Sequence, residues 1–322
     1  MRFFQKLLNK FNGLYYPQEY LCLAQESFYQ PLYAYCIQDG KITKDITQLH
    51  CFVGYCPLIF ALPFAANVWQ EQIDIAFTTV PKQLNELLSH KDALATLSLK
   101  KIHQQNITND AIAYYEGHRG HHRFISSFHQ CINSINNRLH GQKLGNIFLK
   151  GNLHKQVQIA YAIPRKISLI TVANQNKYNH FPTDLHGQIS DEHYIISLRH
   201  AGAACKQVEA AQKIVLSDMQ SSTYKQVYSL GKNHMQPLKE YSAFDFGDQL
   251  SKCLQLPLPK NKHSYKELVL ESSFIHGIHR LLLFKIMHRE PVNPEYKTLA
   301  HLHNTYATWR HKKGLAGNYL LR

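Results

Sequence analysis

A series of short apolar, β-branched segments in the second half of the chain constrains the fold most. Turn-forming residues separate the segments, and each one is shorter than a typical helix. Val, Ile and aromatic residues of this kind favour strands. The segments are residues 157–163, 167–173, 194–198 and 214–217. Two more strands are expected within 267–287, divided at Ser272, Ser273 and Gly277, and a short helix within 206–211. The second half therefore predicts a mainly β unit.

The first half predicts a mixture of strands and helices. Strands separated by turns are expected over 14–66, with one tight turn at Asp39 and Gly40. Leucines at mixed three- and four-residue steps predict helix over 81–104. A loop over 107–123 and an amphipathic helix over 124–139 follow. We expect a domain boundary near residue 145, with a β and helical region at 1–145 and a second domain at 146–322. A divergent second barrel in the first half stays open as an alternative.

Length and composition predict a folded protein without a membrane span. The chain has 322 residues, of which 44% are hydrophobic and only 18% charged, and disorder requires low hydrophobicity together with high charge. The apolar run at 51–66 is shorter than the ~20 residues of a membrane helix and is broken by Gly54, Pro57 and Pro63. The apolar stretch at 1–8 is too short for a signal peptide. Seven cysteines without a Cys-x-x-Cys pair indicate reduced thiols, and we expect a cytoplasmic protein.

The charge balance favours an anionic partner. Lys and Arg number 36 against 22 Asp and Glu, which gives a formal net charge of +14 with His neutral. Such a charge suits nucleic acid, a membrane surface or a phosphorylated small molecule, and composition leaves all three open. The 21 histidines add positive charge on mild acidification.

Several common site motifs are missing from the sequence. No Gly-x-Gly-x-x-Gly follows a strand, as a Rossmann domain requires, and no Gly-x-Ser-x-Gly marks a hydrolase. Three histidine groups have spacings that a metal ion can use, but groups of this kind arise by chance in a chain with so many histidines, and we expect no native metal site. These groups are His118 with His121 and His122, His276 with His279, and His301 with His303.

An ordered set of segments in the second half carries a resemblance to a known family. Residues 164–173 begin with Pro164 and Arg165 and continue as a strand; residues 179–185 read Asn-His-Phe-Pro-Thr-Asp-Leu, and residues 194–199 form a further strand. This order resembles the flavin reductase-like, FMN-binding split-barrel family. Glu267 and the Gly277-x-His279 step within 275–282 resemble its late strand pair. The resemblance covers about residues 157–290.

The resemblance implies a fold, a cofactor and a reaction. The expected fold is mainly β, with an FMN-binding split β-barrel in the C-terminal half. The expected function is that of an NAD(P)H-dependent flavin reductase-like oxidoreductase, working as a homodimer with FMN near the subunit interface. Its implied catalytic residue is His279, beside the flavin ring. The implied cofactor-binding residues are Asn179, His180, Phe181, Thr183, Ser197, Arg199, His200 and Lys206.

The chemistry of FMN agrees with these residue types. Its phosphate requires charge-assisted donors, which Arg199, His200 and Lys206 supply. A helix beginning near Ala203 would point free N–H groups at the same anion. A plainly structural role stays open for Arg199 as a solvated charge at a strand end, for Asn179 and Thr183 as residues of an ordinary turn, and for His279 as a cap of a strand end.

One departure from the family carries an expectation of its own. Many members have Ser and Thr where this chain has Pro182, Thr183 and Asp184. A carboxylate next to a phosphate is unfavourable, so we expect Asp184 to point away from the phosphate or to pair with a base.

Other functions and roles stay open beside the flavin reductase. The chain can be a flavin-binding protein without turnover, or a basic nucleic-acid-binding protein in which some of its 19 Tyr and 16 Phe stack on bases. The second is less favoured, because the charge is spread thinly and no docking motif is present. Near the C-terminus, Tyr306, Trp309 and Arg310 can close over a site, form a dimer contact or simply pack.

Overall fold

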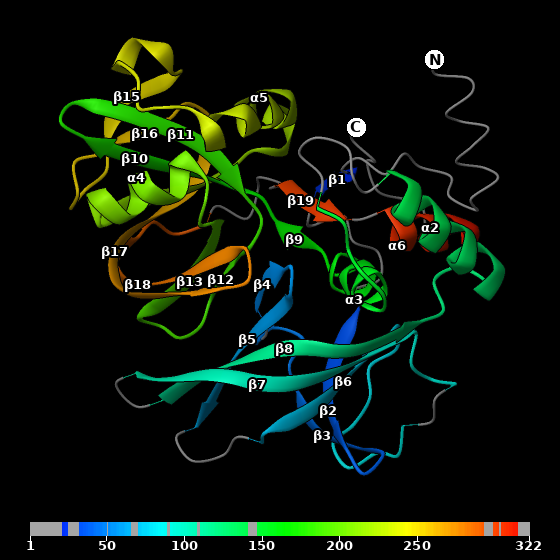
Figure 1. The fold of residues 1–322 in the computed structure, drawn as a ribbon. Helices are drawn as coiled ribbons and strands as arrows, with labels where there is room; N and C mark the ends of the chain where they lie inside the picture. Colours follow the sequence, from blue (N-terminus) through cyan, green and yellow to red (C-terminus); the bar gives the residue numbers. More distant parts are fainter. Residues whose placement is uncertain are drawn as a thin grey trace.

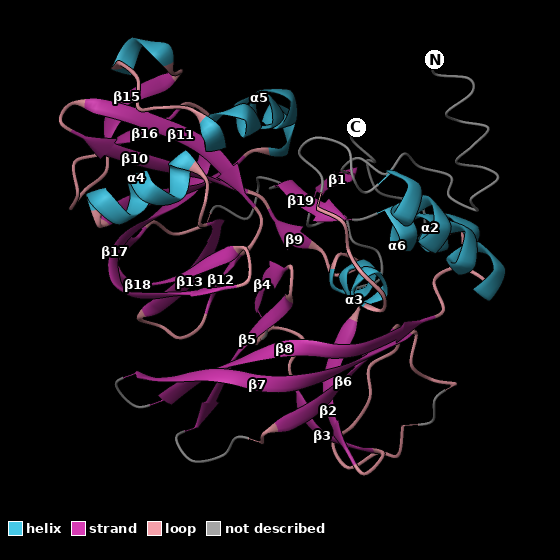
Figure 2. Cartoon of the chain, in the orientation of Figure 1, coloured by secondary structure: helices cyan, strands magenta, loops and turns pink. Residues whose placement is uncertain are grey.

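The computed structural model describes a mainly β chain built around two seven-stranded antiparallel sheets (Figures 1 and 2). The mainly β prediction is thereby confirmed. None of the helices in the described part of the chain is both long and apolar enough to span a membrane. The described residues are 21–24, 32–49, 51–65, 70–88, 91–107, 110–140, 147–292, 299–302 and 304–314.

The first sheet uses residues of the N-terminal half in the order β3-β2-β6-β7-β8-β5-β4. The predicted turn at Asp39 and Gly40 is confirmed between its first two strands; both residues have positive φ there. The strands are β2 (Tyr33–Gln38), β3 (Lys41–Asp45), β4 (Cys51–Tyr55), β5 (Leu58–Ala65), β6 (Gln72–Thr78), β7 (Ala95–Ile107) and β8 (Asp110–His122).

The second sheet has the order β11-β10-β14-β17-β18-β13-β12. Every strand predicted between residues 167 and 287 is found in it, and Gly277 lies in the turn between β17 and β18. The division expected at Ser272 and Ser273 is wrong, because β17 continues through both residues with only a register shift between Leu270 and Ser272. The strands are β10 (Ser168–Asn174), β11 (Lys177–Thr183), β12 (His186–Gln188), β13 (His193–Arg199), β14 (Lys213–Met219), β17 (Lys262–His276) and β18 (His279–Arg289).

The two sheets share one topology. When the strands of each sheet are numbered by their order along the chain, their spatial order across both sheets is second, first, fifth, sixth, seventh, fourth, third. When Asp110 is matched with His279, two register shifts also coincide. In the first sheet, β7 has one extra residue where it pairs with Tyr114 and Tyr115 of β8. In the second sheet, β17 has one extra residue where it pairs with Leu283 and Phe284 of β18, the two residues that match Tyr114 and Tyr115. A second pair of shifts coincides nearer the start of β7 and of β17. The first half therefore repeats the barrel of the second, the alternative that the sequence left open.

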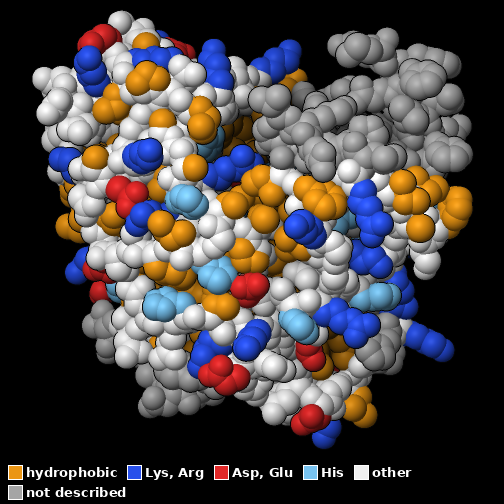
Figure 3. Space-filling model, viewed as in Figure 1, with side chains coloured by type: hydrophobic (Ala, Val, Ile, Leu, Met, Phe, Trp, Pro, Cys, Tyr) orange, Lys and Arg blue, Asp and Glu red, His pale blue; other side chains and the backbone are white. Residues whose placement is uncertain are grey.

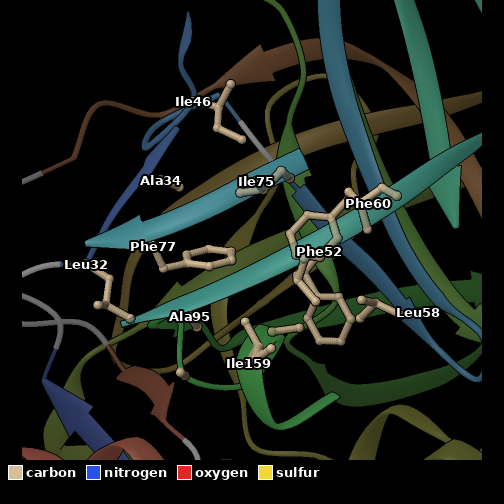
Figure 4. Packing of buried hydrophobic residues seen from close by; sticks show 14 of the residues in the cluster. Leu32, Ala34, Ile46, Phe52, Leu58, Phe60, Ile75, Phe77, Ala95 and Ile159 are labelled. Carbon is tan, nitrogen blue, oxygen red and sulfur yellow. The ribbon is translucent and has the colours of Figure 1, made fainter. Parts of the chain in front are cut away.

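Each sheet curls around its own apolar core. Figure 4 shows the first core, in which Phe52, Phe60 and Phe77 pack with aliphatic side chains and with Ile159 from a neighbouring helix. The second core contains Phe181 and Phe284 and is covered by α4 (Ala203–Ala211), the helix predicted within 206–211.

Further elements connect the sheets and cover their edges. The predicted boundary near residue 145 lies outside the described residues and stays a prediction. A three-stranded sheet has the order β1-β19-β9. The remaining elements are α2 (Ser127–His140), α3 (Leu153–Ala160), α5 (Tyr224–Ser229), α6 (Asn304–Lys312), β1 (Leu21–Ala24), β9 (Arg165–Lys166), β15 (Phe246–Leu250), β16 (Pro257–Pro259), β19 (Leu299–Leu302), η2 (Ser221–Thr223), η3 (Leu230–Met235) and η4 (Tyr241–Ala243).

Three local predictions in the first half and the connection are wrong. The helix expected over 81–104 is replaced by irregular structure and β7, where Ala95, Leu97 and Leu99 are buried at a two-residue period. The loop expected over 107–123 is strand β8. The strand expected over 157–163 is replaced by helix α3 and its end, because α3 docks on glycines of β8: the Asn152 side chain bonds both the N–H and the C=O of Gly120. The helix expected over 124–139 is confirmed as α2.

Candidate functional site

The two sheets pack against each other through equivalent strands. In Figure 1, β4 lies next to β12 and β13, and the structure records contacts of β4 with both. Gly187 of β12 lies so close to Cys51 of β4 that a Cβ on Gly187 would be 2.2 Å from the thiol sulfur. We call this contact between the sheets the seam. Its buried apolar residues are Cys51, Val53, Ile59, Ala61, Ile112 and Tyr114 from the first sheet and Ile189, Ile195, Leu281 and Leu283 from the second.

Contacts across the seam are reciprocal, as in a two-fold dimer. Gln105 occupies the register position in β7 that Phe274 occupies in β17, and His103 corresponds in the same way to Ser272. The Gln105 amide donates to Ser272 Oγ at 2.6 Å, and the His103 ring lies 4.4 Å from the Phe274 ring. Reciprocity of this kind is the signature of an isologous interface, here formed within one chain.

At one end of the seam, the β17–β18 turn docks on the β4–β5 turn. Gly277 has φ +58°, and a Cβ there would meet the Cys56 carbonyl oxygen at 2.3 Å. The next residue, Ile278, donates its N–H to that same oxygen at 3.1 Å. Glycine is required here both for the left-handed backbone and for the close approach. The contact holds Tyr55 against the second sheet, and we call this place the Tyr55 corner.

His279 is buried at the Tyr55 corner, with 1% of its surface exposed. Its Nε2 accepts a hydrogen bond from the Tyr55 N–H at 3.3 Å, and its Nδ1 lies 3.0 Å from Ser197 Oγ. In the neutral ring, Nδ1 therefore carries the hydrogen and donates a hydrogen bond to Ser197 Oγ. Burial, and next the positive charge of Arg199, lower the pKa of His279 to about 4. The ring is thus neutral near pH 7, and both its nitrogens are occupied.

The predicted phosphate donors lie on the surface of the second barrel. Arg199, His200 and Lys206 are all exposed, at the end of β13 and in the first turns of α4. Arg199 donates to the Tyr55 hydroxyl, and its guanidinium lies 5.6 Å from the centre of the Tyr55 ring. The structure therefore brings Ser197, Arg199 and His279 together with an aromatic residue of the first sheet.

The predicted residues of β11 are placed differently, because their side chains are buried. Asn179 Nδ2 donates to Gln207 Oε1 at 2.7 Å and to the Asn233 carbonyl at 3.0 Å. His180 Nδ1 lies 3.0 Å from Thr171 Oγ1, and burial lowers the pKa of His180 to about 4.

The other two residues of β11 are also enclosed. Phe181 belongs to the core of the second barrel, and Thr183 is buried opposite Ser168. In this conformation the four side chains of Asn179, His180, Phe181 and Thr183 build the barrel, and direct contact with a ligand stays only a prediction from the resemblance.

Asp184 pairs with bases, one of the two outcomes expected for it from the sequence. Its Oδ2 lies 3.0 Å from an Arg165 nitrogen and 2.5 Å from His301 Nδ1. The positive Arg165 and the bond to His301 hold the pKa of Asp184 well below its usual range despite burial. The negative charge of Asp184 is therefore balanced within the fold.

The sequence does not predict Tyr55 as a residue of this place, and it leaves three roles open for Tyr306, Trp309 and Arg310. Tyr55 reaches the corner only through the pairing of two barrels, which no local pattern in residues 51–58 reveals. Tyr306 and Arg310 are buried, and Tyr306 stacks with Trp309 in the core of the first barrel. Of their three open roles, the structure shows packing.

Comparison with known proteins returns similarity at the level of structure alone. No protein-family model matches the chain, and no curated protein matches it. The NADH:FAD oxidoreductase SgcE6 of Streptomyces globisporus C-1027 aligns at 12% identity with a TM-score of 0.41, over 46% of this chain and 88% of its own. An FMN-binding protein from Thermus thermophilus aligns at 16% identity with a TM-score of 0.36, over 39% of this chain and 71% of its own. The styrene monooxygenase flavin reductase from Pseudomonas putida S12 aligns at 16% identity with a TM-score of 0.38, over 45% of this chain and 90% of its own. Each of these alignments covers less than half of this chain.

Proposed function

We propose that this chain binds FMN at the Tyr55 corner and is an NAD(P)H-dependent oxidoreductase of the flavin reductase-like type. The observation that carries the proposal is the exposed Arg199 beside the Tyr55 ring, with His200 next to it in the chain and Lys206 in the following helix, both also exposed. Such a group offers charge-assisted donors to a phosphate and an aromatic face to a flat ring.

The residues of the chain hold and orient the cofactor in this proposal. Arg199 binds the phosphate, with His200 and Lys206 as further donors. His279 is a positioning residue, because its buried ring fixes the Tyr55 backbone on one side and Ser197 on the other. Bound FMN would supply hydride and electron transfer from a reduced nicotinamide.

An absorbance titration tests the proposal. Purified protein is mixed with FMN, and the flavin bands are followed together with quenching of flavin fluorescence. Saturable binding is expected, with loss of the nicotinamide absorbance at 340 nm, roughly its maximum, when NADH or NADPH is then added. Protein that is colourless and does not bind added FMN would refute the proposal. Binding without nicotinamide oxidation would leave a flavin-binding protein that lacks turnover.

The homodimer and the cytoplasmic location stay predictions. Because two barrels already pair within one chain, we infer that a single chain forms both sides of the site. Sedimentation at micromolar concentration tests the homodimer, and a monomer that still binds FMN would show that one chain is sufficient.

The nucleic-acid alternative gains no support from the described part of the face shown in Figure 3. Figure 3 shows Lys and Arg scattered over the described part of this face, with Asp and Glu between them. A nucleic-acid-binding surface collects its positive charge on one face or stripe.

A further inference from the structure

The two-fold relation between the barrels creates a second corner, related to the Tyr55 corner by the same symmetry. Strand β5 corresponds to β13 and β8 corresponds to β18. In the second barrel Arg199 pairs with His279, and in the first barrel the same register position pairs Ala65 with Asp110. We call the position of Ala65 and Asp110 the Ala65 corner.

Every basic group of the Tyr55 corner is missing from the Ala65 corner. Alanine stands where Arg199 stands, an acidic residue replaces His279, and Pro63 replaces Ser197. The connection after β13, residues 200–212, contains α4, His200 and Lys206. Its counterpart between β5 and β6 is six residues long, against thirteen after β13, and its sequence has no Lys, Arg or His.

The loop that corresponds to the β4–β5 turn is also changed. Tyr55 precedes that turn, whereas the β12–β13 connection carries Asp191 and Glu192. With Asp110 and Glu71, the residues assigned to the Ala65 corner include four acids and no base, although Lys44 Nζ donates to the Pro63 carbonyl at 3.1 Å and Arg289 donates to the Asp191 carbonyl at 2.6 Å. The Ala65 corner therefore has no counterpart of Arg199, and a phosphate would find fewer charge-assisted donors there than at the Tyr55 corner.

We infer that the chain binds one FMN and not two, and that Tyr55 of the first barrel is a positioning residue of the single site. The inference rests on the proposed function and specifies it. The first barrel has lost its own anion site and serves the second barrel by supplying Tyr55. The Tyr55 hydroxyl accepts a hydrogen bond from Arg199 and so limits the orientations of the guanidinium.

Stoichiometry is the first test, by calorimetric titration of the full chain with FMN. One FMN per chain is expected. Two equivalents per chain would overturn the inference and leave the proposed function standing, whereas no binding would refute the proposed function and the inference with it.

The role of Tyr55 is tested by Tyr55→Phe, which keeps the ring and removes the hydroxyl. The expected result is a roughly three- to tenfold weaker affinity for FMN, as for one lost hydrogen bond, with riboflavin affinity unchanged because riboflavin has no phosphate. Tyr33→Phe, a half-buried tyrosine on β2, is the matched control and should change neither affinity. Equal weakening for FMN and riboflavin, or no weakening for either, would refute the positioning role.

Discussion

At the scale of the residue, Arg199 combines two features that rarely occur together in a plain surface charge. It is exposed, and it is nevertheless oriented by a neighbour, the Tyr55 hydroxyl, which comes from the other barrel. A long side chain held in this way loses less conformational entropy when it binds an anion. Arg199 is therefore the residue on which FMN affinity should depend most.

Replacing Arg199 by Ala should weaken FMN binding about ten- to hundredfold, because a charge-assisted contact contributes roughly 1.5–3 kcal/mol. Arg199→Lys should recover part of the loss, since an ammonium keeps the charge without the planar fork. Titration of each variant with FMN and with riboflavin measures the effect. If riboflavin binding falls as much as FMN binding, Arg199 acts on the fold or the ring rather than on the phosphate.

At the scale of the element, the two barrels differ in the buried side chains at one end of the interior, which are charged in the second barrel and apolar in the first. The second barrel buries Asp218, which lies 2.7 Å from Lys166 Nζ and 3.7 Å from Lys266 Nζ and accepts from Ser168 and Ser264. The matching positions of the first barrel hold apolar residues instead. Ala34, Phe77, Ala95 and Leu97 there correspond to Ser168, Asp218, Ser264 and Lys266. The topology therefore does not require the buried charges.

Removing the central charge of this cluster should destabilise the protein more than removing an outer one. Asp218→Asn leaves Lys166 and Lys266 without their counter-charge, and breaking a buried pair costs about 3–5 kcal/mol. Lys266→Met should cost less, because Asp218 keeps Lys166 and two hydroxyls. Urea denaturation followed by circular dichroism gives both values. Asp245→Asn, which breaks an exposed pair with Lys260, is the control and should cost less than about 1 kcal/mol. A smaller loss for Asp218→Asn than for Lys266→Met would contradict this account.

How far the sequence predicts an element depends on whether its partners are local. Five of the seven strands of the second sheet and α4 are predicted, because their segments carry their own β-branched or helical pattern, whereas β11 and β12 are not. Strand β8 is not, because Gly117 and Gly120 look like loop residues until α3 is packed on them; a Cβ on Gly120 would lie 3.0 Å from Ile159. The site divides in the same way. Arg199 follows from the end of a strand, whereas Tyr55 and the enclosure of His279 follow only from the seam.

At the scale of the whole molecule, the histidines link stability to pH. Several histidine side chains are buried, and burial disfavours their protonated, charged form. Burial is the largest cause that lowers the pKa of five of them to about 4. These are His122, His154, His180, His186 and His279. They lie in both barrels and in α3, so protonation affects the entire structure.

The sign of the effect follows from the two states. In the unfolded chain a histidine has a pKa of about 6.5, so between pH 6.5 and 4 the unfolded state binds more protons than the folded state. Stability is therefore fully present above pH 6.5 and is lost as the pH falls toward 4. Each histidine contributes up to about 1.4 kcal/mol per pH unit, and five together contribute up to roughly 7. Asp184 and Asp218, whose pKa values are depressed, lose their stabilising contribution only at lower pH.

A domain of ordinary stability, about 5–15 kcal/mol, should therefore unfold cooperatively between pH 6 and pH 4, roughly, rather than at the lower pH of carboxylate titration. Urea denaturation at half-unit pH intervals measures the slope. Replacing the buried His122 by Gln should reduce that slope by about one proton, because one site of proton uptake by the unfolded chain is removed. Replacing the exposed His118 by Gln should leave it unchanged. A free energy of unfolding that stays level from pH 7 to about pH 4.5 would contradict the burial of neutral histidines on which this expectation rests.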